Sequence, residues 1–229
     1  MHKNIRIGLT HYHACSYLPE RQERVAIVMD EKLHCPEQYE MLLSNGFRRS
    51  GSTIYKPYCG LCQACQPVRI PVNDFQPSRS QKRLKNKTSH LSWEIKSTLD
   101  PLWYSLYERY IEQRHQNGSM YPPDQAEFEK FSSCSWLSTS YIHIYDADQL
   151  VAVAVTDMLP DSGSAFYTFY DPDSSLSLGT FAVLLQIQIC QMMNKEWLYL
   201  GYQIDECPAM NYKTRFHPHQ RLVNQRWHR

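Results

Sequence analysis

The sequence feature that most constrains the fold is a set of three cysteines at C-x-x-C-x-x-C spacing, namely Cys59, Cys62 and Cys65. Two short runs of β-forming residues flank it, Thr53 to Tyr58 and Val68 to Val72. Thiols at this spacing fix the geometry of a loop when they bind a metal ion or a cluster. We therefore expect Gly46 to Val72 to be the ordered centre of a small lobe that contributes to the active site.

An arginine pair, Arg48 and Arg49, lies just before these cysteines. The preceding segment, Pro36 to Ser44, begins with a proline and an acidic first turn, and Gly46 follows where many helices end. This pattern predicts a short helix, with the two arginines emerging from its capped end into a loop.

Composition limits the class of protein. A chain of 229 residues with 42% hydrophobic content can bury one sizeable core, either in one large domain or in a small lobe plus a main domain. No apolar run approaches the roughly 18 residues of a membrane span, and Met1 to Thr10 lacks the apolar core of a signal peptide. We therefore expect a cytoplasmic protein without a membrane partner, and its eight cysteines as reduced thiols or metal ligands.

Charge is segregated along the chain although the formal net charge is only +1. Between Gly46 and Lys87, nine Lys and Arg residues face the single Asp74. The tail after Glu206 is also basic and contains no acidic residue. A positive face of this kind attracts a phosphate backbone, although a solvated helix surface would show the same pattern.

One basic segment has the features of a phosphate-binding helix. Ser78 can cap a helix whose basic residues recur at helical spacing. Contacts from such a helix hold a nucleic acid without reading its bases. The predicted contacts are Arg79, Lys82, Arg83, Lys85 and Lys87, together with Lys213 from the basic tail.

The remaining pattern predicts a mixed α and β main domain. Turn-rich residues at 73–77 suggest a boundary between a lobe at 1–75 and a domain at 76–229. Helices are expected at 101–116, 125–131 and 181–193, and strands at 91–97, 141–145, 150–158, 165–170 and 197–202. The predicted class is therefore α+β, with a cysteine-containing N-terminal lobe.

Two ordered blocks of the sequence resemble a known family. The elements GFRRSG, YKPYC, the cysteine run and VRIPV resemble the amino-terminal region of the aminoacyl-tRNA–protein transferases. The segments FYTFYDPDSSLSLGT and LYLGYQIDECPAMNYKTRFHPH resemble the carboxy-terminal core of the same family. The compact length and the cysteine spacing look like its bacterial leucyl branch. The resemblance implies a GNAT-like acyltransferase core, which agrees with the order of the predicted elements.

The resemblance also implies an activity. The expected reaction moves leucine from Leu-tRNA to the α-amine of proteins that begin with Asp or Glu and marks them for N-end-rule degradation. Arginyl transfer to the same acceptors is the alternative, because arginine would need a buried acid and Asp157, Asp171 and Asp205 remain candidates. A zinc-knotted tRNA-binding module without catalysis is a third possibility.

The family places a cysteine at the position of Cys15 together with the later three, so the implied ligand set is Cys15, Cys59, Cys62 and Cys65. The eukaryotic pattern has a second cysteine where this chain has Leu18. Zinc, an iron–sulfur cluster and no metal are all compatible with this spacing. Transfer itself should need no cofactor, because an aminoacyl ester is already activated. The SLGT segment at 177–180 also lacks the phosphate-binding loop expected of a CoA enzyme.

The predicted catalytic residues are Asp171 and Tyr170. Asp171 could orient or deprotonate the incoming amine, or it could simply form a turn before Pro172. No nucleophile motif is present, so positioning and oxyanion stabilisation are expected to supply the rate.

The predicted acceptor-binding residues are Arg48, Arg49, Tyr55, Tyr58 and Tyr202. A guanidinium selects an acidic side chain by charge-assisted hydrogen bonds. The arginines could instead contact tRNA phosphates, and one of the pair could brace the fold. Tyr202 and Tyr170 could equally be ordinary core residues.

Overall fold

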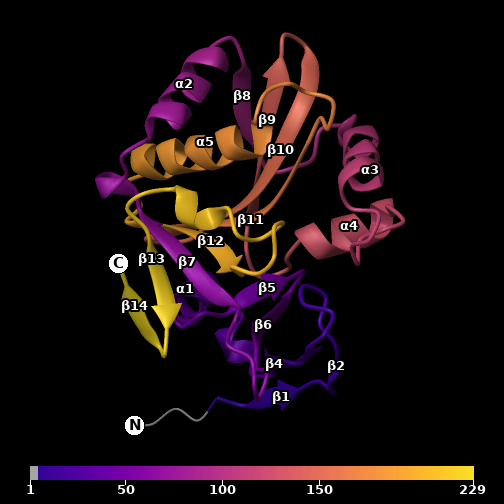
Figure 1. Ribbon diagram of the computed structural model, residues 1–229, viewed down its shortest axis with the longest axis vertical. Helices are drawn as coiled ribbons and strands as arrows, with labels where there is room; N and C mark the ends of the chain where they lie inside the picture. Colours follow the sequence, from indigo (N-terminus) through magenta and orange to yellow (C-terminus); the bar gives the residue numbers. More distant parts are fainter. Residues whose placement is uncertain (1–4) are drawn as a thin grey trace.

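The computed structural model describes residues 5–229, so the first four residues of the predicted lobe lie outside it. The chain is a mixed α and β structure in which an eight-stranded sheet runs through the main body and a four-stranded sheet lies beneath it (Figure 1). Strand order is β14-β13-β7-β12-β11-β10-β9-β8 in the large sheet and β1-β4-β6-β5 in the small one, with β2 and β3 as a separate pair. A mixed α and β fold was predicted from the sequence.

The N-terminal part contains the small sheet and one helix. Its elements are β1 (Ile7–Leu9), β2 (His13–Ala14), β3 (Gln22–Glu23), β4 (Val25–Val28), the one-turn helix η1 (Glu31–Leu33), α1 (Pro36–Ser44), β5 (Arg48–Ser50) and β6 (Thr53–Pro57). The helix α1 has the predicted bounds, and Gly46 follows it with φ of +88°, a conformation that favours glycine.

The prediction that the arginine pair lies in a loop after α1 is wrong. Arg48 and Arg49 lie in β5, which pairs antiparallel with β6 in the register Arg48↔Tyr55 and Arg49↔Ile54. Gly51, at φ of +54°, makes the tight turn that joins the two strands. Because neighbouring residues of a strand point to opposite faces, the two arginines are directed to different places.

The rest of the chain builds the large sheet and the helices around it. Its elements are β7 (Gln66–Pro71), η2 (Val72–Asp74), α2 (Arg79–Lys87), β8 (Ser92–Lys96), α3 (Trp103–Arg114), α4 (Gln125–Ser132), β9 (Thr139–Asp146), β10 (Gln149–Met158), β11 (Ser162–Tyr170), α5 (Leu178–Met192), β12 (Trp197–Gln203), η3 (Lys213–Arg215), β13 (Gln220–Val223) and β14 (Arg226–His228). The strand β7 precedes the predicted boundary at residue 75 yet pairs with β12 inside the large sheet. The boundary itself stays a prediction.

Helices cover both faces of the large sheet, and the residues of β10 show why. Ala152 and Ala154 are buried in the cluster that contains α5, whereas Val153 and Val155 are buried in the cluster that contains α3. This period-two alternation buries both faces of the strand. Figure 1 shows α5 and α2 on one side and α3 and α4 on the other.

Two short strands form one edge of the large sheet. The strands β13 and β14 extend the large sheet beyond β7 and were not predicted, because the short C-terminal runs lack a clear alternation.

The longest helix, α5, spans 15 residues, and no helix within residues 5–229 is long and apolar enough to cross a bilayer.

Candidate functional site

A cavity opens where β11 and β12 separate. The two strands pair in parallel only between Ser162–Ser164 and Trp197–Tyr199. Beyond that point their residues, together with those of α2, α5, β5 and η3, line a cavity of about 1140 Å³. A cavity of this size at a gap between parallel strands is a typical place for a ligand.

The cavity has basic but no acidic side chains. Its lining includes Arg48, Arg49, Lys213 and Arg215. Among the residues between 5 and 229 that line it, none is Asp or Glu. Apart from Arg49, whose charge is balanced by Asp157, these cations give the cavity a field that favours anions.

Arg48 lies at the point where the two strands part. Its Nη2 donates to the carbonyl oxygen of Ala165 on β11 over 2.9 Å, and its side chain also approaches Gly201 on β12. Gly201 has φ of +85°, so another residue there would strain the backbone beside Arg48. Only 7% of Arg48 is exposed, and its Nη1 is buried without a hydrogen-bond partner among the described residues. A buried unpaired guanidinium nitrogen is costly, and an anion in the cavity would satisfy it.

Arg49 is directed to the opposite face of β5 and is fully engaged. Its Nε and Nη2 donate to the two carboxylate oxygens of Asp157 on β10, over 2.8 and 2.6 Å. Further donations reach backbone oxygens, including that of Ser132, and the Phe166 ring stacks 4.0 Å from the guanidinium carbon. No N–H direction of Arg49 remains for an acceptor. The geometry therefore favours the alternative that this arginine braces the fold.

Lys213 was grouped with the tRNA-binding residues, but it is not a surface residue. Only 4% of it is exposed, because η3 folds into the cavity wall together with the buried Phe216. Burial and the nearby charge of Arg48 lower the pKa of Lys213 to about 7. Lys213 is therefore not part of the exposed basic surface, and its contact with tRNA stays a prediction.

Tyr170 lies in the cavity wall at the end of β11. Its ring packs 4.9 Å from that of Tyr110 on α3, and it also lies close to Gly179 near the start of α5. A Cβ at position 179 would lie 2.9 Å from the Tyr170 ring, so glycine is needed for this close approach.

The other predicted tyrosines separate into two groups. Tyr55 and Tyr202 line the cavity, and the Tyr202 hydroxyl donates to the Gly46 oxygen over 2.8 Å. Burial raises the pKa of both phenols, which therefore stay protonated. Tyr58 is 55% exposed, does not line the cavity, and lies beside Arg24 instead.

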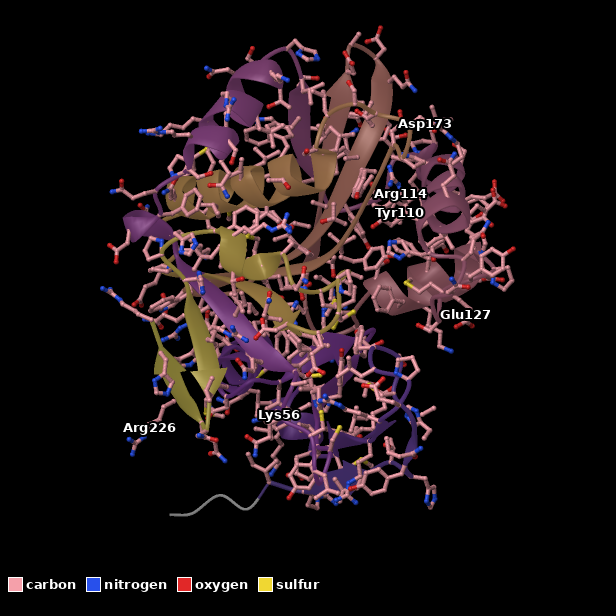
Figure 2. All side chains as sticks on the ribbon, in the orientation of Figure 1. Lys56, Tyr110, Arg114, Glu127, Asp173 and Arg226 are labelled. Atoms are coloured by element: carbon pink, nitrogen blue, oxygen red, sulfur yellow. The ribbon has the colours of Figure 1, made fainter. Side chains whose placement is uncertain are left out.

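Asp171 faces α3 and does not line the cavity. Its Oδ1 accepts from Arg109 Nη2 over 2.8 Å and from the Asp173 backbone over 3.2 Å. In the same region Arg114 donates to the Pro172 oxygen, and Figure 2 shows Arg114, Tyr110 and Asp173 gathered beside α3. These contacts favour a structural role for Asp171 in the turn before Pro172 over a role in deprotonating the incoming amine.

The basic helix α2 borders the cavity. Ser78 caps it as predicted and forms a capping box with Gln81, which lines the cavity together with Leu84. The five predicted tRNA contacts of this helix are exposed, and none forms an ion pair with a residue of the described chain: Arg79, Lys82, Arg83, Lys85 and Lys87.

The predicted cysteine ligands lie near one another. Burial and the neighbouring Cys15, Cys59 and Cys62 together raise the pKa of the Cys65 thiol to about 12. Arg21 donates to Cys62 Sγ over 3.4 Å, and the Cys59 thiol contacts the Arg24 oxygen over 3.8 Å. Across residues 5–229, no group of three or more His, Cys, Asp or Glu residues is arranged to hold a metal ion. The predicted zinc or iron–sulfur site is therefore not supported.

One contact in the cavity wall, between His115 and Tyr110, was not predicted from the sequence. His115 Nε2 lies 2.9 Å from the Tyr110 hydroxyl, and both residues line the cavity. The spacing of five residues along the end of α3 was the only available signal. Burial lowers the pKa of His115, which favours its neutral form.

Comparison with known protein families identifies the family of this chain. Residues 13–83 match the family described as arginine-tRNA-protein transferase, N terminus, and residues 102–223 match its C terminus. The chain therefore belongs to the arginine-tRNA-protein transferase family, which makes it a transferase, as the sequence predicted.

Curated relatives carry a more specific name. The chain is 63% identical over 226 residues to "Aspartate/glutamate leucyltransferase" from Vibrio campbellii, covering 98% of this chain and 97% of the relative. It is 45% identical over 224 residues to the protein of the same name from Aeromonas hydrophila, covering 97% and 94%. The structure of L-PGS from Bacillus licheniformis aligns with a TM-score of 0.47 at 9% identity, over 73% of this chain and 51% of that one, too low a similarity to support an inference.

Proposed function

We propose that this chain transfers leucine from Leu-tRNA to the α-amine of proteins whose first residue is Asp or Glu. The name shared by relatives of up to 63% identity supports this function. One structural observation carries it: the cavity between β11 and β12 has cations and no carboxylate within the described chain. Such a site selects an acidic side chain and has no place for a cationic one.

The acceptor's carboxylate is proposed to bind Arg48. Arg48 lines the cavity, its Nη1 is buried without a described partner, and its Nη2 is held by donation to Ala165. A carboxylate there would form a charge-assisted hydrogen bond in a region protected from water. Tyr55 and Tyr202 line the same part of the site and remain proposed contacts of the acceptor.

The donor preference follows from the absence of an acid. An arginyl group would need a carboxylate in the cavity, and the three candidates are engaged elsewhere. Asp157 pairs with Arg49, Asp171 with Arg109, and Asp205 with Arg221 over 2.7 Å. The part of the cavity beside α2 and α5 includes Leu84, Val183, Leu200 and Phe216, an apolar surface that suits a leucyl side chain.

The proposed chemistry needs no base in the cavity. The neutral α-amine attacks the ester carbonyl and a C–N bond forms. The C–O bond to the terminal ribose then breaks, the nitrogen loses a proton, and the departing ribose oxygen takes up a proton, with solvent carrying the proton between them. An α-amino group has a pKa of about 7.7–8.0, so a useful fraction is neutral near pH 7.5. Holding the amine and the ester in contact supplies most of the rate. We propose that Tyr170, in the cavity wall, contacts the reacting groups.

The larger arrangement supports tRNA binding beside the cavity. We propose that the exposed basic face of α2 holds the acceptor arm of the tRNA, because this helix borders the cavity through Ser78, Gln81 and Leu84. The β9–β10–β11 meander, the buried α5 and the splayed β12 are the order proposed for a GNAT-like core. A charged tRNA donor implies a cytoplasmic enzyme, and the products would enter N-end-rule degradation.

A screen of charged tRNAs against short peptides tests the proposal. Purified protein is incubated with Leu-tRNA or Arg-tRNA and peptides that begin with Asp, Glu or Ala, and the products are weighed by mass spectrometry. A leucyl adduct on the Asp and Glu peptides alone is expected. An arginyl adduct would replace leucine by arginine as donor, and no adduct in any mixture would favour the non-catalytic tRNA-binding module.

A further inference from the structure

A second buried cation lies in the cavity beside Arg48. Lys213 is 4% exposed, and its Nζ makes only long contacts, 3.4 Å to the Met210 oxygen and 3.5 Å to the Met210 sulfur. The ring of Tyr212 lies 4.6 Å from the same nitrogen. A buried lysine is normally paired with a carboxylate, yet no described residue supplies one to Lys213.

Arg48 and Lys213 lie close together in the wall of the same cavity. Arg48 is close enough for its charge to act on Lys213, and both side chains line the same cavity. Their hydrogen-bonding capacity is incomplete, because Arg48 Nη1 has no described partner. Two like charges in a poorly hydrated site repel each other, and one carboxylate between them would relieve the repulsion and satisfy both.

We propose that Lys213 is the second cation of the pocket that receives the acceptor's acidic side chain, and that it takes up a proton when that side chain binds. This inference rests on the proposed function, and it adds a specificity residue to it. Arg48 alone would attract a carboxylate but carries a permanent charge. A lysine beside it makes carboxylate binding depend on pH.

The surroundings of Lys213 explain the proton uptake. The groups that act on it are Arg48 from β5, the Cys207 thiol from the loop after β12, and the adjacent Tyr212. Burial and Arg48 lower its pKa to about 7, whereas Cys207 raises it slightly. A bound carboxylate favours the charged form and raises the pKa again. At pH above 7 the free lysine is increasingly neutral, so binding of an acidic acceptor must be accompanied by a proton.

Kinetics with matched peptides tests the role in selection. The variants are Lys213→Met, Lys213→Arg and the control Lys56→Met, and the acceptors begin with Asp or with the isosteric Asn. Lys56 is also partly buried, with a pKa lowered by burial, but it donates to the Asn45 oxygen over 2.8 Å outside the cavity (Figure 2). Lys213→Met should lower the Asp-over-Asn preference in kcat/KM at least tenfold and leave KM for Leu-tRNA unchanged. Lys213→Arg should retain the preference, and Lys56→Met should match the wild type.

The pH profile separates a binding role from a structural one. For the wild type, KM for the Asp peptide should rise as pH increases above about 7, approaching tenfold per pH unit, because the protonated lysine disappears. Lys213→Arg should abolish this rise, since arginine stays charged. A Lys213→Met enzyme with unchanged preference, or a wild-type KM that is flat between pH 6.5 and 8.5, would overturn the inference.

A binding measurement keeps the inference separate from the transfer reaction. Calorimetric titration of the Asp peptide into the tRNA-free protein, in two buffers of different ionisation enthalpy, reports protons taken up directly. At pH 7.5 the wild type should take up most of a proton and Lys213→Arg almost none. Uptake without any leucyl transfer would reject the proposed function alone. Binding without uptake, or no binding of the Asp peptide, would reject the inference even if transfer occurs.

Discussion

Arg49 and Asp157 form a bidentate ion pair that joins the two sheets, with Nη2–Oδ1 and Nε–Oδ2 distances of 2.6 and 2.8 Å and no exposure of either side chain. The pair connects β5 of the small sheet to β10 of the large one. Since Arg48 is the next residue along β5, the ion pair also fixes where Arg48 enters the cavity. Arg49 thus stabilises the contact between the sheets, and Arg48 lines the cavity proposed to bind the acceptor.

Replacing the acid of this pair should destabilise the protein. Asp157→Asn leaves the buried Arg49 guanidinium without a counter-charge, and breaking one partner of a buried pair costs about 3–5 kcal/mol. Urea unfolding followed by circular dichroism measures the loss. Asp148→Asn is the control, because Asp148 is exposed and forms no ion pair within the described chain, and should change stability by less than about 0.5 kcal/mol. Equal stability of the two variants would show that the pair does not brace the sheets.

Replacing the neighbouring arginine should affect the acceptor instead. Arg48→Met should reduce kcat/KM for an Asp peptide roughly 10- to 100-fold, because hydrogen bonds to charged groups contribute about 1.5–3 kcal/mol. The KM for Leu-tRNA should not change. Arg226→Met removes an exposed arginine of β14 that does not line the cavity (labelled in Figure 2), and should behave as the wild type. A parallel loss of Leu-tRNA affinity in Arg48→Met would assign this arginine to tRNA phosphates.

Charge reversal on α2 should weaken tRNA binding without changing the fold. The triple variant Arg79→Glu, Lys82→Glu, Arg83→Glu removes three proposed phosphate contacts. The slope of log affinity for Leu-tRNA against log salt should become shallower by roughly 2–3, since each contact contributes about 0.7–0.9. Arg226→Glu serves as a single-charge control on β14. If the slope of the triple variant equals that of the wild type, the tRNA lies elsewhere.

The contact between Gly179 and Tyr170 offers a test of Tyr170. In Gly179→Ala the new Cβ would lie 2.9 Å from the ring, which also packs against Tyr110. The ring must move, so leucyl transfer should fall more than about tenfold. The higher helix propensity of alanine, about 1 kcal/mol, opposes the cost of moving the ring, so the free energy of unfolding should change by no more than about 2 kcal/mol. Unchanged kcat in this variant would remove Tyr170 from the reacting centre, and Tyr170→Phe then distinguishes the ring from its hydroxyl.

Local signals in the sequence were sufficient for most of the elements. The proline and glycine around α1 predicted its bounds, and Ser78 with Gln81 marked the start of α2. The apolar run of α5 and the alternation in β9, β10 and β11 were equally clear. These signals depend on neighbours a few residues apart, which is why one sequence sufficed.

The roles of the charged residues depended on distant partners. Arg49 and Asp157 are 108 positions apart, so no local pattern could assign one arginine to the core. Recognising Arg48–Ser50 as a strand would have indicated opposite directions for the pair, but three residues are too few for a visible alternation. Lys213 looked like a surface cation because the tail is basic, and only the folded chain shows that it lines a cavity and is buried.

The most direct test of the central claim compares Asp and Asn peptides with Leu-tRNA and Arg-tRNA in one mass-spectrometric assay. The account predicts a leucyl adduct on the Asp peptide, far less on its Asn counterpart, and no arginyl adduct on either. Equal leucylation of the Asp and Asn peptides would contradict the claim that cations in the cavity bind the acceptor's carboxylate. An arginyl adduct on the Asp peptide would contradict the claim that the cavity has no carboxylate to bind a cationic donor.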